Sequence, residues 1–186
     1  MPAVFLDRDG TIIEDVGYLD RLDKLDLFPW TVDAIRALNR AGLPVVVVTN
    51  QSAVARGFIT ESFVDQVHRE LGTRLSGGGA RVDAFYYCPH HPDGTVARYA
   101  RRCDCRKPER GLVERAARDL NLDPSRSFVV GDTWLDIGLA RAFGARGVLV
   151  RTGSGAVEEM RPPASLRADA VVDNLAAAVS WILMAC

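Results

Sequence analysis

Two aspartates one residue apart follow the first apolar run of the chain. The segment Val4 to Thr11 reads V-F-L-D-R-D-G-T, so Asp7 and Asp9 come directly after a run with the length of a buried strand. In an open α/β fold, such a strand brings its last residues to the carboxyl edge of the sheet, where ligands bind. Gly10 permits a turn that swings Asp9 toward the side that Asp7 faces. A simple turn is the alternative interpretation of D-G-T alone.

Polar residues of the kinds that handle phosphate follow three later apolar runs. They are Thr49-Asn50-Gln51, Arg106-Lys107-Pro108, and Gly131-Asp132 with Asp136 one helical turn on. Each group alone is also typical of a turn or a helix cap. Four such groups in sequence indicate a phosphoryl-transfer site.

The chemistry of that site requires positive charge. A carboxylate that attacks phosphorus approaches a dianion, so a hard divalent cation and a fixed ammonium group are needed to cancel charge in the transition state. Asp132, Asp7 and the backbone carbonyl of Asp9 would hold Mg²⁺, which prefers few carboxylates together with water and phosphate. Lys107 would supply the ammonium group, and the amides of Asn50 and Gln51 would bind phosphoryl oxygens.

Composition limits the classes of protein that the chain can represent. Its 186 residues are 48% hydrophobic and 25% charged, which predicts a single domain over residues 1–186. The net charge of -1 indicates no broad basic surface for nucleic acid. No apolar stretch approaches the roughly 20 residues that span a membrane, and no signal peptide is recognised. We therefore expect a cytoplasmic monomer with a small-molecule substrate.

Apolar runs of strand length alternate with helical periodicity along the chain. The pattern predicts strands at 4–7, 44–49, 82–87, 128–131, 147–150 and 170–172, and helices at 31–41, 60–75, 111–120, 135–143 and 175–184. The β-branched run 44–49 is typical of a central parallel strand that is buried on both faces. The alternation predicts an α/β fold with one doubly wound, mostly parallel sheet. The loops are too short to contain a large cap domain.

A second candidate metal site lies in the loop over residues 88–105. Cys88-Pro-His90-His91 and Cys103-Asp-Cys105 offer a C-x-H and a C-x-C pair, separated by twelve residues. Three thiolates and an imidazole can form a tetrahedral site that favours Zn²⁺ over Mg²⁺. The alternative is a buried cysteine with surface histidines. His91 is the other candidate for the imidazole ligand.

The four groups of polar residues together resemble the motifs of the haloacid dehalogenase (HAD) superfamily of aspartate-nucleophile phosphotransferases. The resemblance implies that Asp7 is the nucleophile and that Asp9 is the general acid and base. It further implies that Thr49 binds the phosphoryl group, that Lys107 fixes nucleophile and phosphate together, and that Asp132 holds Mg²⁺. Asp136 is typical of the outer shell of the metal.

The combination of D-R-D-G-T, T-N-Q-S-x-x-A-R-G, C-P-H-H-P and C-x-C-R-K-P is similar to the zinc-containing branch of that superfamily. This branch includes phosphatases that remove the 7-phosphate of D-glycero-D-manno-heptose 1,7-bisphosphate for nucleotide-activated heptose in lipopolysaccharide or surface glycans. Histidinol-phosphate phosphatases are close relatives and remain the alternative. The resemblance covers Val4 to Thr152 and implies that His90 is the zinc ligand. One departure is Ala53, where these proteins commonly carry glycine.

Substrate selection is expected to rest on basic and amide side chains near the catalytic lysine. A second phosphate needs its own cation, and Arg106 stands beside Lys107 where a guanidinium group can bind it with two hydrogen bonds. Arg8, Asn50, Gln51 and Arg56 complete the predicted substrate-binding set. The alternatives outside catalysis are a fold that has lost activity and a zinc-loop binding module, for which the chain offers arginines but no aromatic stacking surface.

Overall fold

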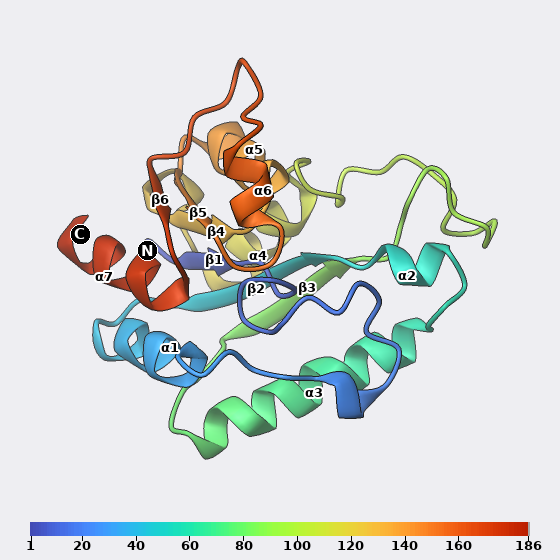
Figure 1. Cartoon of the computed structure of the whole chain (residues 1–186), viewed down its shortest axis with the longest axis horizontal. Helices are drawn as coiled ribbons and strands as arrows, with labels where there is room; N and C mark the ends of the chain where they lie inside the picture. Colours follow the sequence, from blue (N-terminus) through green and yellow to red (C-terminus); the bar gives the residue numbers. More distant parts are fainter. Residues whose placement is uncertain (186) are drawn as a thin grey trace.

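The structure is a computed structural model that describes residues 1–185. Six strands form one all-parallel sheet in the order β3-β2-β1-β4-β5-β6 (Figure 1). The strands are β1 (Val4–Leu6), β2 (Val45–Asn50), β3 (Ala84–Cys88), β4 (Phe128–Gly131), β5 (Arg146–Val150) and β6 (Ala170–Val172). The chain winds outward from β1 to β3 and then returns to β4 on the other side of β1. This order places the topological switch point between β1 and β4, where open α/β sheets bind ligands.

Helices cover both faces of the sheet, as the doubly wound fold class predicts. One face packs against α1 (Thr31–Arg40), α3 (Glu61–Gly77) and α7 (Leu175–Ala185), and the other packs against α4 (Gly111–Leu120) and α5 (Trp134–Phe143). Side chains alternate along β1, so Val4 and Leu6 enter the first core and Phe5 enters the second. β1 is therefore buried on both faces, which fixes the position of the residues that follow it.

The predicted elements are all present, with small differences at their ends. β1 ends at Leu6 rather than at Asp7, and α3 begins at Glu61 because Thr60 is its N-cap and accepts a hydrogen bond from the Phe63 backbone N–H at 3.2 Å. The sequence did not predict the short helices α2 (Ser52–Ala55) and α6 (Gly155–Glu159), nor the 3₁₀ turns η1 (Leu22–Lys24) and η2 (Pro124–Arg126). These elements are too short for a hydrophobic period to develop.

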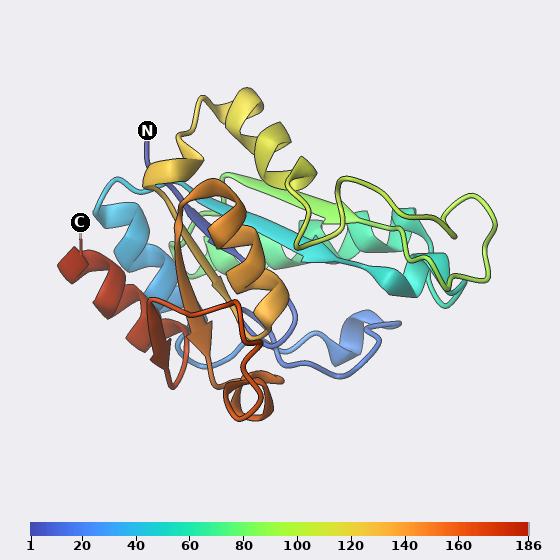
Figure 2. The same ribbon diagram turned by 90° about the horizontal axis from the view of Figure 1, so that it is seen from above.

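The segment between β3 and α4 extends beyond the carboxyl ends of the strands and lies beside α2 (Figure 2). It has no regular secondary structure, but it is anchored to α2, because the backbone N–H groups of Thr95 and Val96 donate to the Ala55 carbonyl at 2.8 and 2.9 Å. Tyr99 is buried there against Val54. The predicted zinc loop is thus held against the segment that follows β2.

Among the described residues, no helix is both long and apolar enough to cross a membrane.

Candidate active site

Three buried carboxylates meet at the switch point of the sheet. Asp7 follows β1, Asp132 follows β4, and Asp136 lies in the first turn of α5. One carboxylate oxygen from each of them lies within 4.8 Å of the others. The Asp7 backbone N–H continues the sheet pairing by donating to the Val130 carbonyl at 2.9 Å. The two strands therefore deliver Asp7 and Asp132 to one place.

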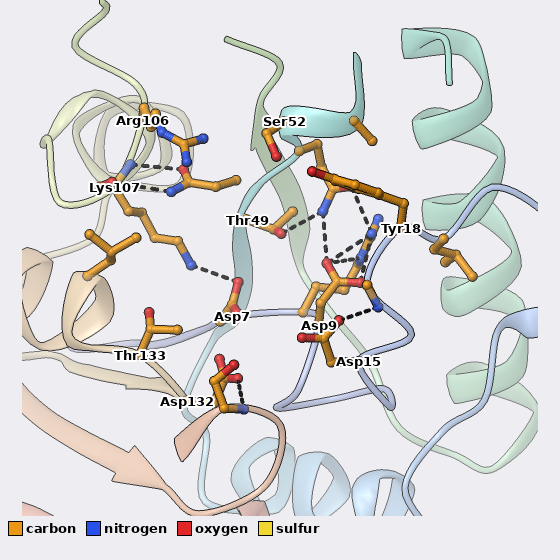
Figure 3. Close-up of a pocket in the computed structure, with 18 residues that line it drawn as sticks. Asp7, Asp9, Asp15, Tyr18, Thr49, Ser52, Arg106, Lys107, Asp132 and Thr133 are labelled. Atoms are coloured by element: carbon orange, nitrogen blue, oxygen red, sulfur yellow. Dashed lines mark hydrogen bonds and ion pairs between the residues drawn. The ribbon is translucent and has the colours of Figure 1, made fainter. Parts of the chain in front are cut away.

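Lys107 reaches this centre from the segment before α4 (Figure 3). Its Nζ lies 2.7 Å from Asp7 Oδ1 and 2.7 Å from Asp136 Oδ1, and its side chain is 3% exposed. Asn50 fixes the backbone of Lys107, because Asn50 Oδ1 accepts from the Lys107 N–H at 2.9 Å and Asn50 Nδ2 donates to the Lys107 carbonyl at 3.2 Å. Asn50, predicted to bind substrate, therefore uses its amide to hold the lysine.

The electrostatics of the centre favour an additional cation. Burial raises the pKa of Asp7 to about 6, despite the opposing charge of Lys107. Burial and the negative charge of Asp7 raise the pKa of Asp132 to about 8. Burial alone would lower the pKa of Lys107, but the charges of Asp136 and Asp7 outweigh it and raise that pKa. One ammonium group does not balance three buried carboxylates, and carboxylate oxygens suit a hard divalent cation.

The backbone around Asp132 comes close to its carboxylate. Gly10 and Gly153 have φ values of +80° and +57°, and a Cβ atom on either would collide with the Asp132 side chain. The Ser154 backbone N–H donates to Asp132 Oδ2 at 2.8 Å. The sequence prediction missed Gly153 and Ser154. The signal for them was the T-G-S-G run that begins two residues after the fifth strand, at the same edge of the sheet.

Asp9 lies on the other side of the cleft from Lys107 (Figure 3). Its carboxylate accepts hydrogen bonds from Arg8, at 3.0 and 3.1 Å, and from Gln51 Nε2 at 2.9 Å. Gln51 Nε2 also donates to Thr49 Oγ1 at 2.9 Å. Arg8, predicted to bind substrate, has a side chain that is only 2% exposed, and its guanidinium group is turned to Asp9.

An open cleft of about 200 Å³ joins these residues. The predicted site residues that line it are Asp7, Arg8, Asp9, Thr49, Asn50, Gln51, Arg106, Lys107 and Asp132. Residues without a predicted role also line it: Asp15, Gly17, Tyr18, Leu19, Ser52, Ala53, Thr133, Leu135 and Ser154. Four of these come from the loop before η1, which has no strand-end pattern that would have marked them. Arg56 is not among the lining residues, and its carbonyl accepts from Thr95 Oγ1.

The second predicted metal site is also assembled. Cys88, His90, Cys103 and Cys105 form a cluster that could hold a metal ion. The Cys105 Sγ lies 2.9 Å from Cys88 Sγ and 3.3 Å from His90 Nδ1. His91 lies outside the cluster, and its Nδ1 accepts from the Asp93 backbone N–H at 3.1 Å.

The pKa values of two thiols in this cluster shift in opposite directions. The hydrogen bond between Cys88 and Cys105 and burial raise the pKa of Cys88, whereas the same hydrogen bond lowers the pKa of Cys105 to about 5. One thiolate is thus stabilised by its neighbours. A soft cation can replace the remaining protons, so the donor set suits Zn²⁺.

The thiol cluster adjoins the cleft through the backbone. Cys105 directly precedes Arg106 and Lys107, and Arg106 Nη1 donates to the His90 carbonyl at 3.3 Å. The Gln51 backbone N–H donates to the Cys88 carbonyl at 2.8 Å. Both segments that line the cleft opposite Asp132 are therefore tied to the cluster.

Comparisons with known proteins agree with this geometry. A family model described as HAD-hydrolase-like matches residues 104–178. A D-glycero-D-manno-heptose-1,7-bisphosphate 7-phosphatase of Thermosynechococcus vestitus is 44% identical, over 97% of this chain and 95% of its own. The D-glycero-beta-D-manno-heptose-1,7-bisphosphate 7-phosphatase of Escherichia coli K12 is 41% identical, over 95% and 91%. The crystal structure of the D,D-heptose 1,7-bisphosphate phosphatase of B. bronchiseptica with magnesium and phosphate superposes with a TM-score of 0.87, at 31% identity and full coverage of both chains.

Proposed function

This chain belongs to the D-glycero-D-manno-heptose-1,7-bisphosphate 7-phosphatase family of HAD-like hydrolases, and from that membership we propose that it removes the 7-phosphate of such a heptose bisphosphate. The observation that carries the proposal is the contact of Lys107 Nζ with Asp7 at 2.7 Å. Asp7 also belongs, with Asp132 and Asp136, to a group of carboxylates that could hold a metal ion. A module without catalytic function has no need for this buried arrangement. The product is heptose 1-phosphate, a precursor for nucleotide-activated heptose.

In the proposed reaction, Asp7 attacks the phosphorus and the bond from phosphorus to the sugar oxygen breaks. Asp9 gives its proton to the leaving alkoxide, and an aspartyl-phosphate forms on Asp7. Asp9 then takes a proton from water, which attacks the phosphorus and releases inorganic phosphate and Asp7. Lys107 holds Asp7 and the phosphoryl oxygens together, and the Thr49 hydroxyl donates to one of those oxygens.

Two metals with different roles are part of the proposal. Mg²⁺ would be bound by Asp7, Asp132 and the Asp9 backbone carbonyl, with Asp136 in its outer shell, and would offset the charge of the phosphoryl group. The relative from B. bronchiseptica was crystallised with magnesium. Zn²⁺ would be bound by Cys88, His90, Cys103 and Cys105 and would hold the loop that carries Arg106. Because free thiols need reducing conditions, we infer a cytoplasmic location.

We further propose that Arg106 binds the 1-phosphate that is retained. It lines the cleft one residue before Lys107, and the loop that carries it is tied to the thiol cluster. A charge-assisted hydrogen bond contributes about 1.5 to 3 kcal/mol, so Arg106→Ala should lower kcat/KM on the bisphosphate by roughly ten- to a hundred-fold. Monophosphates, which lack the distal group, should lose much less.

Phosphate release from a panel of substrates tests the assignment. The panel contains both anomers of the heptose bisphosphate, histidinol phosphate and fructose 1,6-bisphosphate, each with wild-type protein and with Arg106→Ala. We expect the highest kcat/KM for one of the heptose anomers and a selective loss in the variant. Faster hydrolysis of histidinol phosphate would overturn the heptose assignment and leave the phosphatase class. The same preparation in analytical ultracentrifugation tests the proposed monomer.

A further inference from the structure

A buried chain of polar side chains runs from Asp9 away from the cleft to helix α3. Arg8 Nε and Nη2 donate to the Asp9 carboxylate, and Nη2 also donates to Gln51 Oε1 at 2.9 Å. The remaining amino group, Nη1, lies 3.4 Å from Nε2 of His68. His68 stands 60 positions from Arg8 in the sequence, and no phosphatase motif includes it.

The direction of each hydrogen bond in this chain follows from the arginine. A guanidinium group only donates, so Gln51 must turn its oxygen to Arg8 and its amide N–H groups to Asp9 and Thr49. Thr49 Oγ1 accepts from Gln51, which leaves its own hydrogen free for a phosphoryl oxygen. His68 must likewise accept at Nε2, so its proton is on Nδ1.

The surroundings of His68 keep it in that accepting form. The ring stacks on Phe85 at a centroid distance of 4.9 Å and meets the edge of Tyr87 at 5.7 Å, both from β3. Burial and the positive charge of Arg8 lower the pKa of His68 to about 3. The imidazole is therefore neutral near pH 7, and two aromatic neighbours fix its orientation.

We propose that His68, Arg8 and Gln51 are positioning residues that fix the orientation of the carboxylate of Asp9, the general acid and base. His68 anchors Arg8, and Arg8 and Gln51 together fix the rotamer of Asp9 and the hydroxyl of Thr49. This inference rests on the proposed phosphatase chemistry, since it assigns these residues to the proton transfers of that reaction. It assigns Arg8 a positioning role in place of substrate binding, because four of its five guanidinium N–H groups face Asp9, Gln51 and His68.

If this is the role of His68, its substitution should impair proton transfer by Asp9 rather than binding of the substrate. Without an acceptor at position 68, Nη1 of Arg8 would be buried and unpaired. Because an unpaired buried donor is unfavourable, the guanidinium group should shift to another acceptor. Asp9 then loses its orientation, which slows protonation of the leaving alkoxide and activation of water. Contacts of the substrate with Arg106 and Lys107 are unchanged, so KM should change little.

Three variants separate positioning from a general loss of stability. His68→Leu removes the acceptor and keeps an apolar side chain, whereas His68→Gln restores an oxygen near the position of Nε2. Val67→Ala is the matched control, since Val67 is buried on the same helix and belongs to the large hydrophobic core, where it offers no hydrogen-bonding group to Arg8. Each variant is assayed with Mg²⁺ on the best sugar phosphate, and its melting temperature is measured.

We expect His68→Leu to lower kcat by about ten-fold or more with KM within about three-fold, in line with the usual contribution of general acid-base catalysis. His68→Gln should recover most of the loss, and Val67→Ala should lose stability without a comparable loss of kcat. A second readout is p-nitrophenyl phosphate, whose leaving group needs no proton donor, so the pre-steady-state release of nitrophenol should be much less affected than kcat on the sugar phosphate.

Several outcomes would overturn the inference. They are an unchanged kcat in His68→Leu, a change in KM alone, equal losses in His68→Leu and Val67→Ala, or equal losses of the nitrophenol burst and of sugar-phosphate turnover. Each of them requires an active wild-type enzyme. If wild-type protein hydrolysed none of the phosphate esters, the proposed function itself would be refuted. Failure of this inference and failure of the proposed function are therefore distinguishable.

Discussion

The acidic centre and the thiol cluster are both built from side chains distant in sequence, but the backbone holds them in different ways. Asp7 and Asp132 directly follow β1 and β4, two neighbouring parallel strands buried in the core. Of the cysteines in the thiol cluster, only Cys88 belongs to a strand, and Cys103 and Cys105 lie in a segment without regular structure. The sheet positions the first site by itself. The segment of the second site is held by its hydrogen bonds to the Ala55 carbonyl and by contacts within the cluster, without a strand of its own.

This difference predicts where each site is vulnerable. Substitution in the acidic centre should remove chemistry and leave the fold, because packing of β1 and β4 does not depend on the carboxylates. Substitution in the thiol cluster should first cost structure and then chemistry, because Arg106 and Lys107 follow Cys105 directly. The following experiments test that division.

The largest effect is expected for Asp7→Asn. The amide is a poor nucleophile, so turnover should fall by more than about a thousand-fold, since no aspartyl-phosphate can form. Lys107 keeps its partner Asp136, so the melting temperature should not fall by more than a few degrees. Phosphate release and differential scanning calorimetry measure the two quantities. A comparable loss of activity and of stability would contradict the division between the two sites.

The next largest effect is expected for His90→Ala, with His91→Ala as its matched control. His90 contributes to the cluster and His91 does not. We expect wild-type protein to hold about one zinc per chain through dialysis and still to need added Mg²⁺. His90→Ala should lose zinc and lower the melting temperature by on the order of 10 °C, with a fall in activity through Lys107. If His91→Ala behaves like His90→Ala, the ligand assignment is wrong.

Much of this arrangement could be predicted from the sequence. Strand ends in a doubly wound sheet share one edge, so four polar groups after apolar runs were enough to place Asp7, Thr49, Lys107 and Asp132 in one cleft. The C-x-H and C-x-C pairs predicted the residues of the thiol cluster in another way, because pairs with this spacing are typical of zinc sites. The predicted roles of these residues remain predictions until they are tested by substitution.

The sequence could not reveal how the side chains divide their hydrogen bonds. Arg8, Asn50 and Gln51 are polar and adjacent to the motifs, so substrate binding was the natural prediction. In the structure Arg8 is buried and donates to Asp9 and Gln51, and the amide of Asn50 pairs with the Lys107 backbone, while both residues also line the cleft. Substrate binding by these residues therefore stays a prediction. Partners such as His68 come from a helix whose sequence pattern indicates only an amphipathic surface. Long-range pairing of this kind has no local signature in the sequence.

A third test uses pH to examine the charge balance of the acidic centre in metal-free protein. Burial raises the pKa of Asp132 to about 8 and that of Asp7 to about 6, both above the usual value for aspartate. These two carboxyl groups therefore bind more protons in the folded state than in the unfolded state between about pH 4 and pH 8, so their contribution to stability falls as pH rises through that window. The lowered pKa values of His68 and Cys105 contribute in the opposite direction. Mg²⁺ should oppose the fall. Denaturation by urea at several pH values measures the fall as the difference in stability between wild-type protein and Asp132→Asn, and a difference that does not change with pH would contradict the raised pKa of Asp132.

The smallest effect is expected for Asn50→Ala, which tests whether the acidic centre needs the contact between the end of β2 and the segment that carries Lys107. Asn50 holds the backbone of Lys107 by two hydrogen bonds, each contributing about 0.5 to 1.5 kcal/mol. Displacement of the ammonium group should lower kcat by roughly five- to thirty-fold. Asn39 is a matched control, because its amide makes the same pair of hydrogen bonds to the Arg81 backbone on the surface, at 3.0 and 2.7 Å. Asn39→Ala should cost similar stability and leave kcat unchanged. An equal kcat for the two variants would mean that the carboxylates alone position Lys107, and that the acidic centre is independent of the segment that the thiol cluster holds.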